Sequence, residues 1–169
     1  MDVVKRRIND LRGEVLVDSE VGVGTTFTLK LQQSMSIIDS LLLEVDNSFF
    51  TVPLSEIVVC SQVEATEIEK QRHTSTLPFN NHLIPFIDLR LLFNLGGHYQ
   101  KNLKIVIIRN NDKELAILSD KIIGEHQAVL KPLGKKLETK QLLLAASQLG
   151  DGNIAFMLDS MALCKTIGN

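Results

Sequence analysis

Residues 115–158 read LAILSDKIIGEHQAVLKPLGKKLETKQLLLAASQLGDGNIAFML, and this stretch decides the fold. Its short apolar runs, bounded by Gly, Pro, Asn and Asp, predict strands joined by tight turns. The sharpest turn is Gly150-Asp151-Gly152-Asn153, because these residue types accept positive φ and close a hairpin at little cost. The stretch contains no acid–base pair, metal cluster or nucleophile arrangement, so it indicates a surface for partners.

The composition is typical of a soluble globular protein. Apolar residues make up 44% of the 169, charged residues 22%, and the formal net charge is −2. Nucleic-acid binding calls for a basic face and stacking aromatics, whereas aromatics make up only 5% here. Neither a membrane span nor the apolar region of a signal peptide is found, so we expect a cytoplasmic protein without direct membrane insertion. Cys60 and Cys164 lie outside any CxxC pattern and predict two buried free thiols in a reducing compartment.

The first 34 residues predict a helix followed by two strands. Apolar positions in 1–12 are spaced for an amphipathic helix that ends at Gly13 and opens without a start signal, as expected if further sequence precedes it. Residues 14–18 and 26–31 alternate as strands do, and on spacing alone the intervening Gly22-Val23-Gly24-Thr25 indicates a hairpin turn. A change to Gln and Ser places a boundary near residue 34.

From residue 35 onward the pattern predicts many short strands and two short helices, which indicates an all-β barrel or sandwich. The expected elements are a strand at 35–45, a turn at 46–47, a strand at 49–52, a helical turn at 53–57, strands at 58–60 and 66–69, a hairpin turn at 80–81, a helix capped by Asp88 and ended by Gly96-Gly97, a hairpin around 110–112, and a closing helix at 159–167 capped by Asp159 or Ser160.

Three segments carry a resemblance to a known family. Residues 83–93 read LIPFIDLRLLF and resemble the IP-hydrophobic-hydrophobic-DL-x-x-LF segment of CheW-like domains. Residues 122–134 and 149–159 match two further signatures of that family in the same order. Three ordered matches are far more specific than any one of them alone.

The N-terminal residues are similar to the end of the ATP-binding domain of CheA-type chemotaxis histidine kinases. The similarity rests on residues 1–8, 13–15 and 22–29, although Leu31-Gln32-Gln33-Ser34 departs from the family's Leu-Pro-Leu-Thr-like junction. It implies that Thr25 and Thr26 are remnants of an ATP site whose other segments lie upstream. ATP and magnesium are therefore implied for the parent kinase, while we expect no cofactor, no catalytic residue and no ATP binding in this chain alone.

The resemblance implies a mainly β, CheW-like fold of two SH3-like five-stranded β-barrels over residues 35–169. A partial α/β remnant of a GHKL-type ATPase domain would precede it at 1–34. It also implies a regulatory coupling domain that binds the CheW adaptor and the cytoplasmic tips of methyl-accepting chemoreceptors. One alternative is a catalytically competent part of a histidine kinase that needs the missing segments. Another is self-association through an exposed barrel edge. A third is a generic barrel that binds nucleic acid, but the net charge and the low aromatic content argue against this one.

The candidate partner-binding residues fall on two predicted strands. Residues 37–43 are apolar on both faces, so this strand is either buried between two layers, which the sequence favours, or presents an exposed patch, which the resemblance favours. The resemblance implies Leu41, Leu42 and Glu44 at one barrel face and Ile122, Ile123 and Gly124 nearer the other, with Gly124 serving a bulge or a close backbone approach. His73, His82, His98 and His126 lack metal-ligand spacing and predict solvent-facing or core-edge side chains without a metal site.

Overall fold

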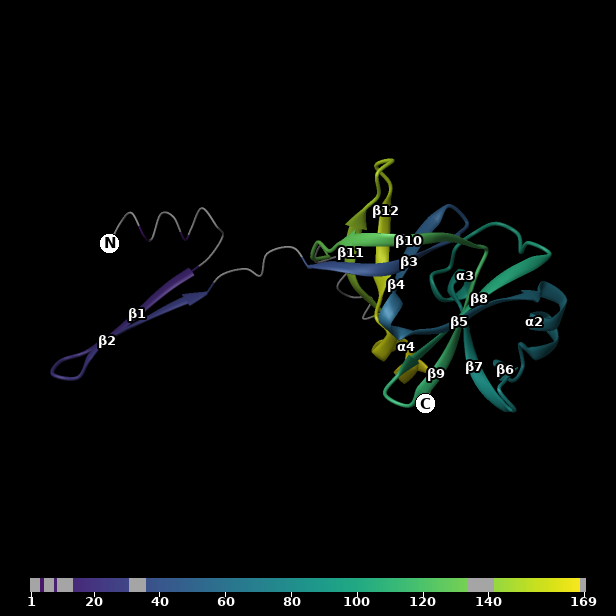
Figure 1. Ribbon diagram of the computed structural model, residues 1–169, viewed down its shortest axis with the longest axis horizontal. Coiled ribbons are helices and arrows are strands. Elements are labelled where there is room, and N and C mark those ends of the chain that lie inside the picture. The colour runs from purple at the N-terminus through teal and green to yellow at the C-terminus, as the bar shows by residue number, and fades with distance from the viewer. Residues whose placement is uncertain (1–3, 5–7, 9–13, 31–35, 134–141, 168–169) are drawn as a thin grey trace. The chain divides into compact units, whose positions relative to one another are not determined.

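The computed structural model of the chain describes residues 4, 8, 14–30, 36–133 and 142–167 (Figure 1). The chain divides into two compact units, Met1–Ser36 and Ile37–Asn169, and each is described by itself.

The first unit contains an antiparallel hairpin. Strands β1 (Glu14–Glu20) and β2 (Gly24–Lys30) pair from Glu14 opposite Lys30 to Glu20 opposite Gly24, as the alternation predicts. Because side chains alternate across a strand, one face of the hairpin is apolar and consists of Val15, Val17, Phe27 and Leu29. Most of the predicted helix at 1–12 lies outside the described residues. The two positions described within it, Val4 and Ile8, are helical.

The second unit consists of two five-stranded sheets, in agreement with the five strands that the resemblance implies for each of two barrels. The first sheet has the order β10-β3-β4-β12-β11 and comprises β3 (Ile37–Val45), β4 (Ser48–Pro53), β10 (Lys121–Val129), β11 (Leu143–Gln148) and β12 (Ile154–Leu158). The second has the order β5-β8-β9-β7-β6 and comprises β5 (Ile57–Glu64), β6 (Thr76–Phe79), β7 (His82–Asp88), β8 (Asn102–Asn110) and β9 (Lys113–Ser119). The helical elements are η1 (Leu54–Glu56), α2 (Ala65–Gln71), α3 (Leu89–Leu92) and α4 (Ser160–Thr166).

The second sheet is one continuous segment inserted between the two halves of the first. The chain crosses from β4 to β5 through η1 and returns from β9 to β10 through the single residue Asp120. The first sheet is completed late in the chain, where β12 enters beside β4 in parallel. Its outer strands approach each other, and Lys131 and Ala146 exchange backbone hydrogen bonds of 2.7 and 2.9 Å, so the sheet curls towards a barrel.

Three predicted hairpin turns share one geometry. Asp46-Asn47, Asn80-Asn81 and Asn111-Asp112 all have positive φ at both residues. This is the requirement of the two-residue turn that matches strand twist, and it explains why Asn and Asp stand there. The predicted caps are also confirmed, since Asp88 accepts from the Arg90 backbone N–H and Asp159 accepts from that of Ala162.

One apolar core is shared by the two sheets. It contains Leu43 and Val52 from the first sheet, Val106 and Ile117 from the second, and Leu163 from α4, none of them accessible to solvent. The other face of the second sheet covers a second core. Strand β8 is therefore buried on both faces, which explains its nearly continuous apolar sequence.

Three local expectations are wrong. Residues 66–69 lie in α2 rather than in a strand, with Ile68 buried in the second core and its charged neighbours facing solvent. The helix after Asp88 ends at Leu92, before Gly96, because Asn94 adopts a positive φ. The cysteines are free as predicted but not buried: Cys60 is exposed on the outer strand β5, and Cys164 is half-buried.

Candidate partner-binding site

The predicted partner-binding residues lie together on one sheet. Strand β10 pairs antiparallel with β3, so that Lys121 lies opposite Glu44 and Gly124 opposite Leu42. The expectation that the two groups mark different barrels is therefore wrong, because the chain returns to the first sheet directly after Asp120.

The leucines of β3 lie inside the molecule. Leu41 and Leu42 are each 8% exposed; Leu41 faces the shared core, and Leu42 packs with Leu149 and Ala155. Strand β3 is thus buried on both faces, the case that the sequence favoured. The exposed apolar side chains on this strand pair are Ile37 and Ile123, at 63% and 51%.

A bulge in β10 separates two neighbouring isoleucines. The pairing register shifts between Ile122 and Gly124, and Gly124 has a φ of +145°. A Cβ on Gly124 would meet no atom within 4 Å, so of the two predicted roles the bulge applies and not a close approach. The bulge lets Ile122 pack against the shared core while its neighbour Ile123 faces solvent.

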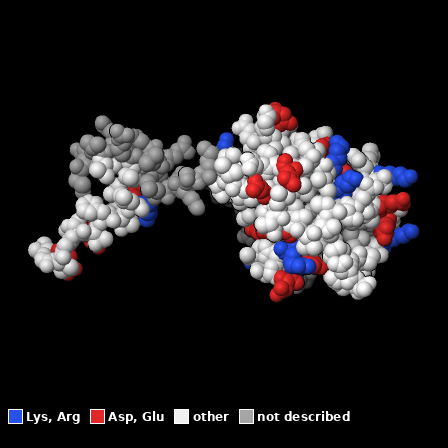
Figure 2. Space-filling model, viewed as in Figure 1, with Lys and Arg blue, Asp and Glu red and all other residues white. Residues whose placement is uncertain are grey.

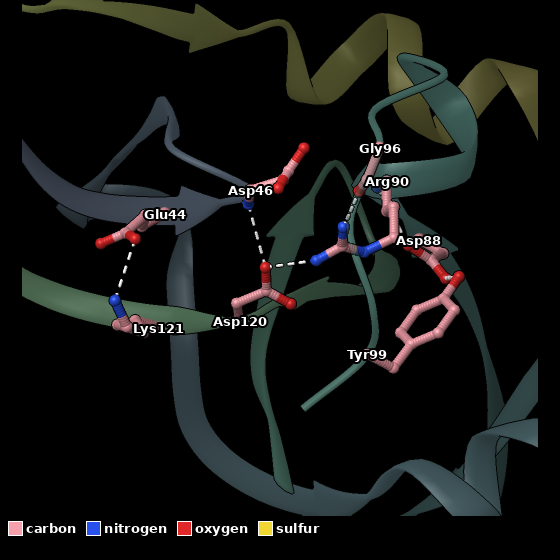
Figure 3. A network of polar contacts seen from close by, with 8 residues as sticks. All are labelled: Glu44, Asp46, Asp88, Arg90, Gly96, Tyr99, Asp120 and Lys121. Atoms are coloured by element: carbon pink, nitrogen blue, oxygen red, sulfur yellow. Dashed lines mark hydrogen bonds and ion pairs between the residues drawn. The ribbon is translucent and has the colours of Figure 1, made fainter. Parts of the chain in front are cut away.

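A polar junction joins the two sheets behind this strand pair. We use that term for Asp46, Asp88, Arg90, Tyr99 and Asp120, which Figure 3 draws together with Gly96. The Asp120 carboxylate accepts from the Asp46 backbone N–H at 3.0 Å and from the Arg90 guanidinium at 2.5 Å (Figure 3). The Asp120 backbone N–H also donates to the Glu44 carbonyl at 3.0 Å. One residue thus contacts β3, the β3–β4 turn and α3.

Arg90 is held in this junction on several sides. Its side chain is 6% exposed, donates to the Gly96 carbonyl, and lies over the Tyr99 ring at 5.3 Å. The Tyr99 hydroxyl in turn donates to Asp88 at 2.6 Å. Burial raises the pKa of the Tyr99 hydroxyl, and the Asp88 carboxylate raises it further.

Gly97 allows the surrounding loop to approach the junction. It has a φ of +82°, and a Cβ there would come within 2.6 Å of Asp46 Oδ1 and 2.8 Å of Arg90 Nη1. Of the junction residues, the sequence predicts a structural role only for Asp88, as a helix cap, and for Asp46, in a hairpin turn. The lone Asp120 between two apolar runs was the one further signal in the sequence, because a carboxylate at a strand junction needs a partner.

At the solvent end of the same strand pair, Glu44 forms an ion pair with Lys121 at 2.9 Å. Glu44 is largely covered, whereas Lys121 is half-exposed. This pair leaves the Glu44 carboxylate already satisfied, so a partner would meet a neutralised site there.

A groove of about 570 Å³ lies between β7, the β8–β9 hairpin and α4. Its lining includes Leu83, Leu115, Cys164 and Ile167 among the apolar side chains and His82, Arg109 and Glu114 among the polar ones. An apolar surface with a few converging polar groups is typical of a binding site.

The polar groups of the groove form a chain. Glu114 accepts from Arg109 at 2.5 Å and contacts His82 Nε2 at 2.9 Å. Arg109 and His82 lower the pKa of Glu114, while the Asn80 carbonyl and Glu114 raise that of His82. His82 is exposed, as expected.

The remaining residues singled out in the sequence lie as follows. Thr25 and Thr26 are exposed on β2, where the Thr25 hydroxyl forms a hydrogen bond of 2.9 Å with the Ser19 hydroxyl. The described residues contain no group of three His, Cys, Asp or Glu side chains placed to hold a metal ion. Among the described helices, none is long and apolar enough to cross a membrane. On the face in Figure 2, acidic and basic side chains of the second unit are interspersed.

Comparison with known proteins gives a consistent result. The family model described as CheW-like domain matches residues 39–167. The chain is 31% identical over 165 residues to the chemotaxis protein CheA of Bacillus subtilis, covering 96% of this chain and 25% of that protein. It is 32% identical to the sensor histidine kinase CheAY of Helicobacter pylori, covering 96% and 20%. The crystal structure of the scaffolding protein TtCheW from Thermoanaerobacter tengcongensis aligns with a TM-score of 0.58 at 12% identity, over 74% of this chain and 86% of that one. The chain thus spans a quarter or less of the length of these two relatives.

Proposed function

This chain belongs to the CheW-like domain family, and on that premise we propose that it is the regulatory coupling domain of a chemotaxis sensor kinase. It binds the CheW adaptor and chemoreceptor tips and passes receptor state to the kinase. One observation carries the proposal: similarity to CheA proteins extends over 96% of the chain, beyond the 39–167 that the CheW-like match covers. That extent favours a kinase-borne domain over a free-standing scaffold.

We place the adaptor contact on the outer side of β10. Ile123 is an exposed large apolar side chain there, and Glu125 is exposed two residues further along the strand. Ile37 is exposed at the other end of the strand pair, opposite Val129. The exposed Ile123 with a carboxylate near it suits a partner that offers its own apolar side chain and a basic group. Leu41 and Leu42 support this surface from below and make no direct contact.

A helical receptor tip fits the groove between β7, the β8–β9 hairpin and α4. Its apolar lining would accept one stripe of an amphipathic helix, and the Arg109–Glu114–His82 chain offers hydrogen bonds at the rim. The groove and the β10 surface are built on different sheets, as two simultaneous partners require.

Coupling needs an element whose state both partners influence. The polar junction meets that need, because Asp120 leads directly into β10 and its carboxylate binds Arg90 of α3, the helix that follows β7 of the second sheet. A partner that shifts β10 therefore changes the free energy of the Asp120–Arg90 pair, and the reverse holds by linkage.

The experiment is a calorimetric titration of the chain with the CheW adaptor of the same organism. We expect saturable binding that an Ile123→Asp variant weakens at least about tenfold, since a carboxylate would be desolvated without a partner. Leu144→Asp is the matched control, because Leu144 is 55% exposed on the same sheet. Unchanged affinity for Ile123→Asp would remove the contact from β10, and absence of binding would leave only the fold in common with the family.

The alternative is a chain that keeps part of the kinase's ATP site. Thr25 and Thr26 lie on an exposed hairpin, and phosphoryl transfer needs a bound triphosphate, magnesium and a positioned His. We propose that the isolated chain does not bind nucleotide. Micromolar affinity for a fluorescent ATP analogue with magnesium would favour the alternative.

A further inference from the structure

Strand β5 is an open edge of the second sheet. Among the described strands it pairs with β8 alone, and six of its eight residues are exposed. The other outer strands of this unit are protected: β6 has four residues and contains Pro78, and the ends of the first sheet are joined through Lys131 and Ala146. Half of the backbone N–H and C=O groups of β5 therefore point away from the sheet without a strand beside them.

The sequence of β5 does nothing to block a further strand. Residues 57–63 read IVVCSQV and contain no charged residue and no proline, the usual devices that protect an edge. Val58 and Val59 are 38% and 37% exposed, and valine has a strong propensity for strands. Carboxylates occur only at the two ends, at Glu56 and Glu64.

We propose that β5 pairs antiparallel with β5 of a second copy of this chain, so that the two second sheets continue into each other. This surface is separate from those proposed for the adaptor and the receptor, and the inference does not depend on them.

Geometry restricts the register. Along a strand, the backbone N–H and C=O groups point alternately to one side and the other. Two copies of the same strand can therefore hydrogen-bond antiparallel only if one residue lies opposite the same residue of the other copy. Centred on Cys60, the pairing would set Glu56 against Glu64 of the other copy. Centred on Ser61, it sets Val59 against Val63 and Cys60 against Gln62, within the part of β5 that follows the bulge at Val58. The Ser61 register therefore joins branched apolar residues and keeps the carboxylates apart.

The dimer is weak and depends on concentration. A single pair of short strands buries well under the roughly 1,200 Å² of a standard interface. Sedimentation over a range of concentrations should therefore show the average mass rising towards twice that of the chain.

Cysteine placement tests the register. In a Cys60→Ser, Cys164→Ser background, Ser61→Cys should form a disulfide-linked dimer on mild oxidation, because the two new thiols lie opposite each other. Gln62→Cys in the same background is the matched control and should not, since it faces position 60 of the other copy, which carries no thiol in that background. Linking through position 62 instead would overturn the register.

Lysine substitution tests the surface. Ser61→Lys and Cys60→Lys, on opposite faces of β5, should each leave the chain monomeric, whereas Leu83→Lys, at a 66% exposed site of the same sheet, should not. A chain that is monomeric throughout, or a dimer that survives both β5 variants, would overturn the proposal. If the parent chain is monomeric and the β5 variants no longer bind the adaptor, the edge pairs with another protein, and the proposed dimer is also overturned.

Discussion

Replacing Asp120 by Asn tests the polar junction most directly. The amide has almost the same shape and still accepts the Asp46 N–H, but it removes the negative charge beside the Arg90 guanidinium. Both side chains are nearly inaccessible, at 6% and 8% exposure, so the remaining charge is buried without its partner. Removing one member of a buried pair costs about 3–5 kcal/mol, and because one hydrogen bond survives we expect about 3 kcal/mol.

The chain offers an assay for this change. Tyr99 is its only tyrosine and there is no tryptophan, so intrinsic fluorescence in a urea titration reports the unfolding of the junction itself. Lys121→Gln is the matched control: it lies one residue away and breaks a half-exposed ion pair, which should cost less than about 1 kcal/mol.

A double variant separates charge burial from shape. Arg90→Met with Asp120→Asn removes both charges and leaves none unpaired, so it should be less destabilised than the sum of the two single variants. A cost for Asp120→Asn as small as that of the control, or strict additivity in the double variant, would refute a buried, mutually dependent pair.

Three further outcomes follow from the described contacts. The pKa of His82 is raised in the folded state, so its contribution to stability is lost as the pH rises through that pKa. The pKa of Glu114 is lowered, so its contribution is lost as the pH falls through that pKa. The urea midpoint of His82→Ala, measured against pH, should therefore differ most from that of the parent between the two pKa values. Absorbance titration of Tyr99 should give a midpoint above that of free tyrosine, and a normal midpoint would mean that the ring is solvated in the folded state. Gly97→Ala should cost at least about 1 kcal/mol more than Gly152→Ala, because both residues have positive φ but only Gly97 has neighbours within contact of a new Cβ; equal costs would place the strain in the backbone alone.

Local sequence signals predicted most of the strands and turns. The Asn and Asp pairs at the hairpins need positive φ, a property of the residues themselves, and Asp88 and Asp159 cap helices through their own side chains. The short α2 was mistaken for a strand because its single buried residue, Ile68, gives no period from which to choose.

The arrangement of the sheets was beyond such signals. Nothing near β3 or β10 in the sequence indicates that they pair, since the segments are some 80 residues apart and the second sheet lies between them. For the same reason, Asp120 and Arg90 gave no sign of their contact, and Ile123 could be separated from Ile122 only once the bulge was seen. The family resemblance implied the two five-stranded units but not which side chains face outward.

The position of β12 has a consequence for synthesis on the ribosome. All five strands of the second sheet lie within one continuous segment, so this sheet can form as soon as residue 119 has emerged. The first sheet must wait, because its β4 has no second neighbour until β12, about a hundred residues later, enters beside it. During that interval β4 is an exposed edge with the apolar residues Phe50 and Val52, both buried in the finished fold. The part of the chain described here is thus most prone to aggregation just before β12 is made.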